Sequence, residues 1–64
     1  MVGKLTLKAA RVNAGLTQEE LAKKANVSRN TVSTWENEPS SMKIKDAELV
    51  CTILNVPINY IFFK

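Results

Sequence analysis

The chain has 64 residues, nine of them Lys or Arg and six Asp or Glu, so one small domain over residues 1–64 is expected to carry a formal net charge of +3. It has no histidine and one cysteine, which excludes Cys/His zinc sites, His-based catalysis and an internal disulfide, and we predict no enzymatic activity, cofactor or metal. Its apolar stretches are too short for a membrane span or a secretory signal, so we expect a reducing, cytoplasmic setting and no membrane partner.

Turn residues divide the chain into five short segments, and each fits a helix better than a strand. The first contains Leu7, Ala10 and Ala14 at helical spacing, and Gly15 ends it because glycine readily adopts the left-handed conformation that closes helices. The second begins with the capping box Thr17–Glu20, in which the Thr17 hydroxyl and the Glu20 carboxylate each accept a backbone N–H from the other residue. The apolar side of this second helix consists of Leu21, Ala22 and Ala25.

Residues 26–28 separate the second helix from a third, which is predicted from Arg29 to about Asn37. Asn26 tolerates the left-handed conformation, and Ser28 is a good N-cap. Pro39 ends the third helix because it disfavours helical geometry at Glu38.

A polar, basic loop over residues 40–45 is expected to precede a fourth helix. Pro57 suits the start of a short fifth helix, Ile58 to Phe63, because a missing N–H costs nothing there. The prediction is therefore an all-α fold of five helices, in which Ile61 and either Phe62 or Phe63 complete the core. The fourth helix is identified by Ala47, Val50, Cys51 and Leu54 at helical spacing, with Cys51 as a buried, inert thiol.

The pair of helices over about residues 17–37 is the most informative feature. Two short helices separated by a tight break form a helix-turn-helix, whose second helix lies in the DNA major groove. At about 100° per residue, Val32 and Trp35 share the inner side of the third helix, where Trp35 is a core aromatic rather than a platform for stacked bases. The opposite side carries Asn30, Ser33, Thr34 and Asn37, with Arg29 at its edge.

The chemistry of this outward side favours base reading. Short amide and hydroxyl side chains suit contacts to adenine, phosphate and bridging water, and arginine suits guanine O6 and N7. Ser, Thr and Asn are mediocre helix formers, so helix propensity gives no reason for four of them here. The alternative is that they simply cover a surface helix.

Three segments carry a family resemblance: residues 15–22 (GLTQEELA), 27–37 (VSRNTVSTWEN) and 54–58 (LNVPI). With these and with Arg11, the chain resembles the phage repressor and Cro-type helix-turn-helix family from Leu7 to Phe62. The resemblance implies a five-helix domain like that of lambda repressor.

The resemblance also implies roles for individual residues. The positions that match base-contacting residues are Arg29, Asn30 and Thr34, and Ser33 borders them. The positions that match DNA-backbone or supporting contacts are Gln18, Asn37, Lys43 and Lys45. Arg11 and Glu36 match a structural ion pair between the first and third helices. Gln18 could instead simply follow the helix cap, and Asn37 could close its helix.

The sequence departs from the family pattern after the third helix. Glu38-Pro39 replaces the usual glycine, and the following loop is about one residue longer, which leaves the path of Lys43 and Lys45 open. Lys4 and Lys8 fit solvated lysines and phosphate ligands equally well.

We therefore expect a sequence-specific, double-stranded DNA-binding regulator, a Cro-like repressor of phage or prophage type associated with the nucleoid. It would bind a palindromic operator as a homodimer through the C-terminal region, Phe62 or Phe63, with half-sites about one helical turn apart. The alternatives are a protein-interaction or antitoxin-like module with the same fold, and the DNA-binding domain of a longer repressor.

Overall fold

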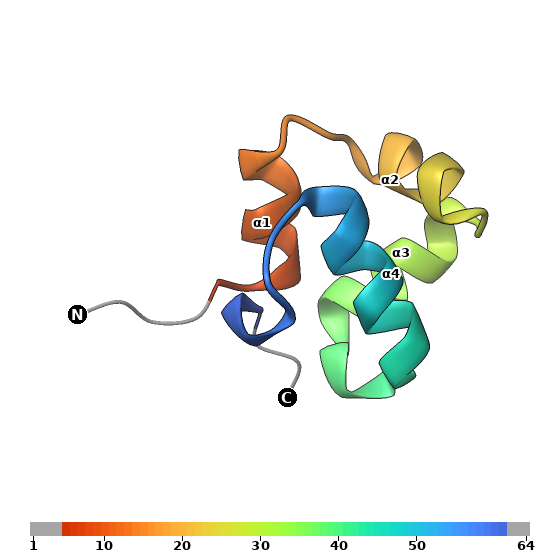
Figure 1. Ribbon diagram of the computed structural model, residues 1–64. Helices are drawn as coiled ribbons and strands as arrows, with labels where there is room; N and C mark the ends of the chain where they lie inside the picture. The colour runs from red at the N-terminus through yellow and green to blue at the C-terminus, as the bar shows by residue number, and fades with distance from the viewer. Residues whose placement is uncertain (1–4, 62–64) are drawn as a thin grey trace.

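The computed structural model describes residues 5–61, which form four α-helices joined by short turns (Figure 1). The α-helices are α1 (Leu7–Asn13), α2 (Gln18–Ala25), α3 (Arg29–Asn37) and α4 (Ile44–Leu54), and two single 3₁₀ turns lie at Pro39–Ser41 and Ile58–Tyr60. The predicted all-α class is confirmed for the described residues, and so are the limits of the third helix.

Side-chain caps determine where the first three helices begin. The hydroxyl oxygens of Thr6, Thr17 and Ser28 each accept the backbone N–H three residues later, at 3.0, 3.0 and 3.1 Å. The Glu20 carboxylate also accepts the Thr17 N–H at 2.8 Å, which completes the predicted capping box. Each of these three helices therefore starts at a position that its own cap specifies.

Left-handed residues end the helices that lead into tight turns. Gly15 has φ 77° after α1, and Asn26 and Asn55 have φ 60° and 59° after α2 and α4. Asparagine adopts this conformation more readily than most residues, as expected for Asn26 from the sequence. The Asn26 turn places the Val27 N–H 3.0 Å from the Ala22 carbonyl, so the chain reverses within a few residues.

Asn26→Ala is expected to lower the free energy of unfolding by about 1 kcal/mol, because a Cβ without asparagine's polar group disfavours the left-handed region. Asn26→Gly should leave stability nearly unchanged. The matched control is Asn13→Ala, since Asn13 is also exposed but lies in a regular helix. Urea unfolding followed by Trp35 fluorescence measures the difference. Equal stability of the alanine and glycine variants at position 26 would contradict this account.

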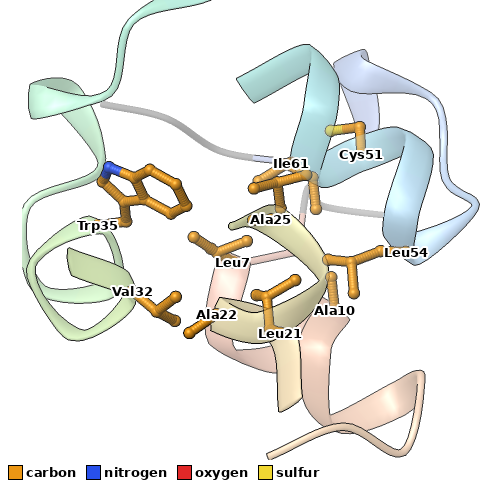
Figure 2. Close-up of a cluster of buried hydrophobic side chains, with 11 residues drawn as sticks. Leu7, Ala10, Leu21, Ala22, Ala25, Val32, Trp35, Cys51, Leu54 and Ile61 are labelled. Carbon is orange, nitrogen blue, oxygen red and sulfur yellow. The ribbon is translucent and has the colours of Figure 1, made fainter. Parts of the chain in front are cut away.

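The core lies where all four helices meet, with α2 packed against both α3 and α4. Figure 2 shows Val32 and Trp35 of α3 on one side of this cluster and Cys51 and Leu54 of α4 on the other. The residues without measurable exposure are Leu21, Val32 and Val50. Because Val32 and Trp35 are both buried, α3 is held by one side and its other side is free.

The prediction of a fifth helix from Ile58 to Phe63 is wrong within the described residues. Only Ile58–Tyr60 turns, and Ile61 is extended, with φ −102° and ψ 136°. Ile61 forms an isolated parallel bridge with Leu5, and its side chain is buried as predicted. A six-residue helix has little stability of its own, so pairing with Leu5 and burial of Ile61 prevail. Phe62 and Phe63, with the dimer contact expected of them, lie outside the described residues.

Candidate nucleic-acid interface

The turn between α2 and α3 is short and closely bonded. It consists of residues 26–28, between the last residue of α2 and the first of α3. The Ser28 hydroxyl accepts the Thr31 N–H at 3.1 Å, and its oxygen lies 2.9 Å from the Thr31 hydroxyl oxygen. These bonds set the direction in which α3 leaves the turn.

The outer side of α3 is polar and accessible. Arg29, Asn30, Thr34 and Asn37 are exposed, whereas Ser33 is half-buried. The structure thus places four of the five side chains expected on this side in contact with solvent, and Ser33 at its margin. The donors and acceptors of an exposed helix side such as this one are free to meet the base edges of a DNA groove.

A buried charge network fixes α3 against the rest of the domain. Arg11 Nε, on α1, donates to Glu36 Oε2, on α3, at 2.5 Å, and Arg11 Nη2 lies 3.4 Å from Glu36 Oε1. Arg11 Nη1 donates to the Leu16 carbonyl at 2.8 Å. Gln18 Nε2, at the start of α2, donates to Glu36 Oε1 at 2.9 Å. A single carboxylate therefore joins three helices.

Burial makes the geometry of this network specific. The Arg11 and Glu36 side chains are only 10% and 5% exposed. Every buried side-chain nitrogen and oxygen within residues 5–61 has a hydrogen-bond partner. An arginine fork on a carboxylate is planar and directional, so it limits how α3 can rotate on the core. The Leu16 carbonyl was not predicted because backbone acceptors carry no residue signature.

The segment after α3 differs from the expected loop. Glu38 leaves helical geometry before Pro39, as predicted, with φ −135° and ψ 75°. However, Pro39–Ser41 forms a 3₁₀ turn, and α4 already begins at Ile44. Lys43 is the exposed N-cap residue of α4, and Lys45 is exposed in its first turn rather than in a loop. Asp46 lies in the first turn of α4, where its negative charge favours the positive end of the helix.

An open hollow of about 580 Å³ lies beside the start of α2. Residues from the first three helices and the turn before α2 line it: Lys8, Arg11, Leu16, Thr17, Gln18, Glu19 and Arg29. Gln18 and Arg29, which are assigned to different DNA contacts, therefore line the same hollow. Lys8, one of the two lysines whose role the sequence left open, also lines this hollow.

Other chemistry within residues 5–61 is limited. No group of three His, Cys, Asp or Glu side chains in this part of the chain could hold a metal ion, and none of its helices is long and apolar enough to cross a membrane. Burial raises the pKa of the Cys51 thiol, which makes its reactive thiolate form scarce at neutral pH.

Comparison with known proteins agrees with this geometry. A family model described as helix-turn-helix matches residues 7–61. A search of curated proteins finds no match.

Proposed function

The chain belongs to the helix-turn-helix family of the phage repressor and Cro type, and on that premise we propose that it is a transcriptional regulator that reads double-stranded DNA with α3. The observation that carries the proposal is the exposed polar side of a helix whose other side is buried through Val32 and Trp35. An α-helix fits the major groove, where each base pair presents a distinct pattern of donors and acceptors.

The proposed contacts follow from side-chain chemistry. Arg29 can donate two hydrogen bonds to guanine, and Asn30 can form a pair of bonds with adenine. Thr34 and the half-buried Ser33 reach the same groove with hydroxyl groups. The DNA backbone is assigned to Gln18, Asn37, Lys43 and Lys45. Gln18 donates one amide N–H to Glu36, so its second amide N–H remains for a phosphate oxygen.

A homodimer on a palindromic operator extends this reading. Nine residues make α3 about 14 Å long, which covers about four base pairs at ~3.4 Å each. Each mismatched base pair costs about 1–3 kcal/mol of binding free energy. One copy of the protein reads only a few base pairs, and a second copy doubles the number of base pairs that are read. Two-fold symmetry would place the half-sites about 34 Å apart, and a bound dimer would block access to a promoter. This role places the protein in the cytoplasm, on the nucleoid.

A second candidate is a protein-interaction module with the same fold. Ile44 and Leu49 on α4 are 75% and 41% exposed, and exposed apolar side chains suit a protein partner. DNA binding by α3 does not account for the exposure of these two apolar side chains. A protein partner on α4, in turn, does not account for the polar outer side of α3.

Selection of bound duplexes from a random-sequence DNA pool at moderate salt distinguishes the candidates. We expect a palindrome with half-sites about one helical turn apart to be enriched. A single enriched half-site would support DNA reading and contradict the dimer. If no sequence is enriched above salt-sensitive background, base reading is wrong and the protein-interaction module is favoured.

A further inference from the structure

The two ends of the described chain are joined to each other. Leu5 and Ile61 form a parallel β-bridge, although they lie at opposite ends of residues 5–61. Ile61 is 2% exposed and is among the largest fully buried side chains of the protein. Leu5 is half-buried and packs against the same core. We call the pair of Leu5 and Ile61 the terminal clasp.

The terminal clasp lies at the start of α1. Leu5 directly precedes Thr6, whose hydroxyl caps this helix. Leu7, the first residue of α1, is buried in the same cluster as Ile61 (Figure 2). With seven residues, α1 is too short to be a stable helix by itself in water. Its helical state therefore depends on the contacts at its two ends, and the terminal clasp provides those at the first.

The other end of α1 carries the buried charge network. Arg11, in the last turn, donates to the Glu36 carboxylate on α3 and to the Leu16 carbonyl. If α1 left the core, these bonds would break, and of the network only the bond from Gln18 would still hold Glu36. The position of α1 therefore affects α3.

The other three helices are connected in ways that do not involve α1 or the terminal clasp. Helix α2 packs against α3 and α4, whereas α1 packs mainly against α3 and the turn Ile58–Tyr60 packs against α4. The caps at Thr17 and Ser28 bond within the first turns of their own helices. Proteins open locally in the segments that have the fewest buried contacts. The two ends of the chain can thus separate from α2, α3 and α4 without breaking the bonds among those helices.

We propose that α1 and residues 58–61 form one cooperative unit, closed by the terminal clasp, which opens while α2, α3 and α4 stay folded. We also propose that this unit must be closed for DNA reading, a step that rests on the proposed function. Opening takes Arg11 away from Glu36, so α3 loses the fork that limits its rotation. The terminal clasp thereby couples the two ends of the chain to the reading helix.

Amide hydrogen exchange, followed residue by residue by NMR, tests the unit in the free protein. Ile61→Ala weakens the closed unit, so the amides of α1 should exchange about 30-fold faster or more. One of them is the Ala10 N–H, which bonds to the Thr6 carbonyl. Asn26→Ala is the control, because it weakens the turn between α2 and α3 and not the terminal clasp. It should accelerate the amides of α2, α3 and α4 about five-fold and leave those of α1 unchanged.

Two results in the free protein would overturn the unit. If Asn26→Ala accelerates the amides of all four helices equally, the domain opens only as a whole. If Ile61→Ala leaves the amides of α1 unchanged, the terminal clasp does not close the unit. Ile58→Ala alters an exposed side chain of the same segment and should have little effect. If Ile61→Ala is unfolded by circular dichroism, Ile61→Val repeats the test with an expected acceleration of about two- to twelve-fold.

The same exchange measurement in the presence of the selected duplex tests the coupling to DNA. If only the closed unit reads DNA, a duplex concentration of about 100 times Kd should slow exchange of the α1 amides up to about 100-fold. Unchanged exchange of these amides in the bound protein would overturn the coupling and leave the proposed function intact. If the protein binds no duplex, the proposed function and the coupling are both wrong, whereas exchange in the free protein still decides whether the unit exists.

Discussion

Replacing Arg11 with methionine is expected to lower the free energy of unfolding by about 3–5 kcal/mol, because it leaves the buried Glu36 carboxylate without its counter-charge. The Glu36 side chain is 5% exposed, so water cannot replace the guanidinium. A domain of this size has a total stability of about 3–10 kcal/mol. The variant should therefore be largely unfolded, or close to unfolding, at ambient temperature.

The double variant Arg11→Met with Glu36→Leu separates the lost charge from the lost packing. Apolar residues of similar volume can replace a buried ion pair at little cost, so the double variant should be more stable than either single variant. Urea unfolding followed by circular dichroism and Trp35 fluorescence gives all four stabilities. A double variant as unstable as Arg11→Met alone would show that the uncompensated charge is not the cause.

The same comparison tests what the network does for DNA reading. In the folded double variant the charges are gone, and Gln18 has lost its acceptor on α3. If the Arg11 fork sets the rotation of α3, the double variant should fold yet discriminate less between the selected duplex and a random one. Unchanged discrimination would mean that packing of Val32 and Trp35 alone sets the rotation.

Local chemistry made the helices predictable. Thr17 with Glu20, and Ser28 before Arg29, specify helix starts through bonds within one turn, and the structure contains those bonds. Asn26 marks the end of α2 because few other residues adopt its backbone conformation at low cost. The buried side of α3 followed from the spacing of Val32 and Trp35. Each of these signals lies within a few residues of the feature that it predicts.

The features that sequence reasoning missed depend on distant parts of the chain. Ile61 is extended because it pairs with Leu5, at the other end of the described residues, and no local pattern near Pro57 reveals this. The early start of α4 has no side-chain cap to mark it, since Lys43 makes no capping bond. The hollow is likewise formed where three helices meet, so local sequence patterns do not reveal which residues line it.

Arg29→Ala is expected to weaken binding to the selected duplex by about 1–3 kcal/mol and to relax the requirement at one base position of each half-site. Arg29 is exposed at the start of α3, where residues of a reading helix meet base edges. Lysine presents a compact ammonium on a flexible stem in place of the rigid planar fork, so Arg29→Lys should weaken the base preference as well. Selection repeated with each variant measures the loss position by position. The control is Lys24→Ala, which removes the same charge from an exposed position in the last turn of α2.

The position of Arg29 at the hollow makes the alternative outcome equally specific. If Arg29 binds a phosphate instead of a base, Arg29→Ala should weaken binding to all duplexes equally and reduce the salt slope by about 0.9, with the selected sequence unchanged. Base reading would then depend on Asn30 and Thr34, which are exposed on α3 and do not line the hollow. The ratio of affinities for the selected and random duplexes therefore decides the role of Arg29: a fall assigns it to a base, and a constant ratio assigns it to the backbone.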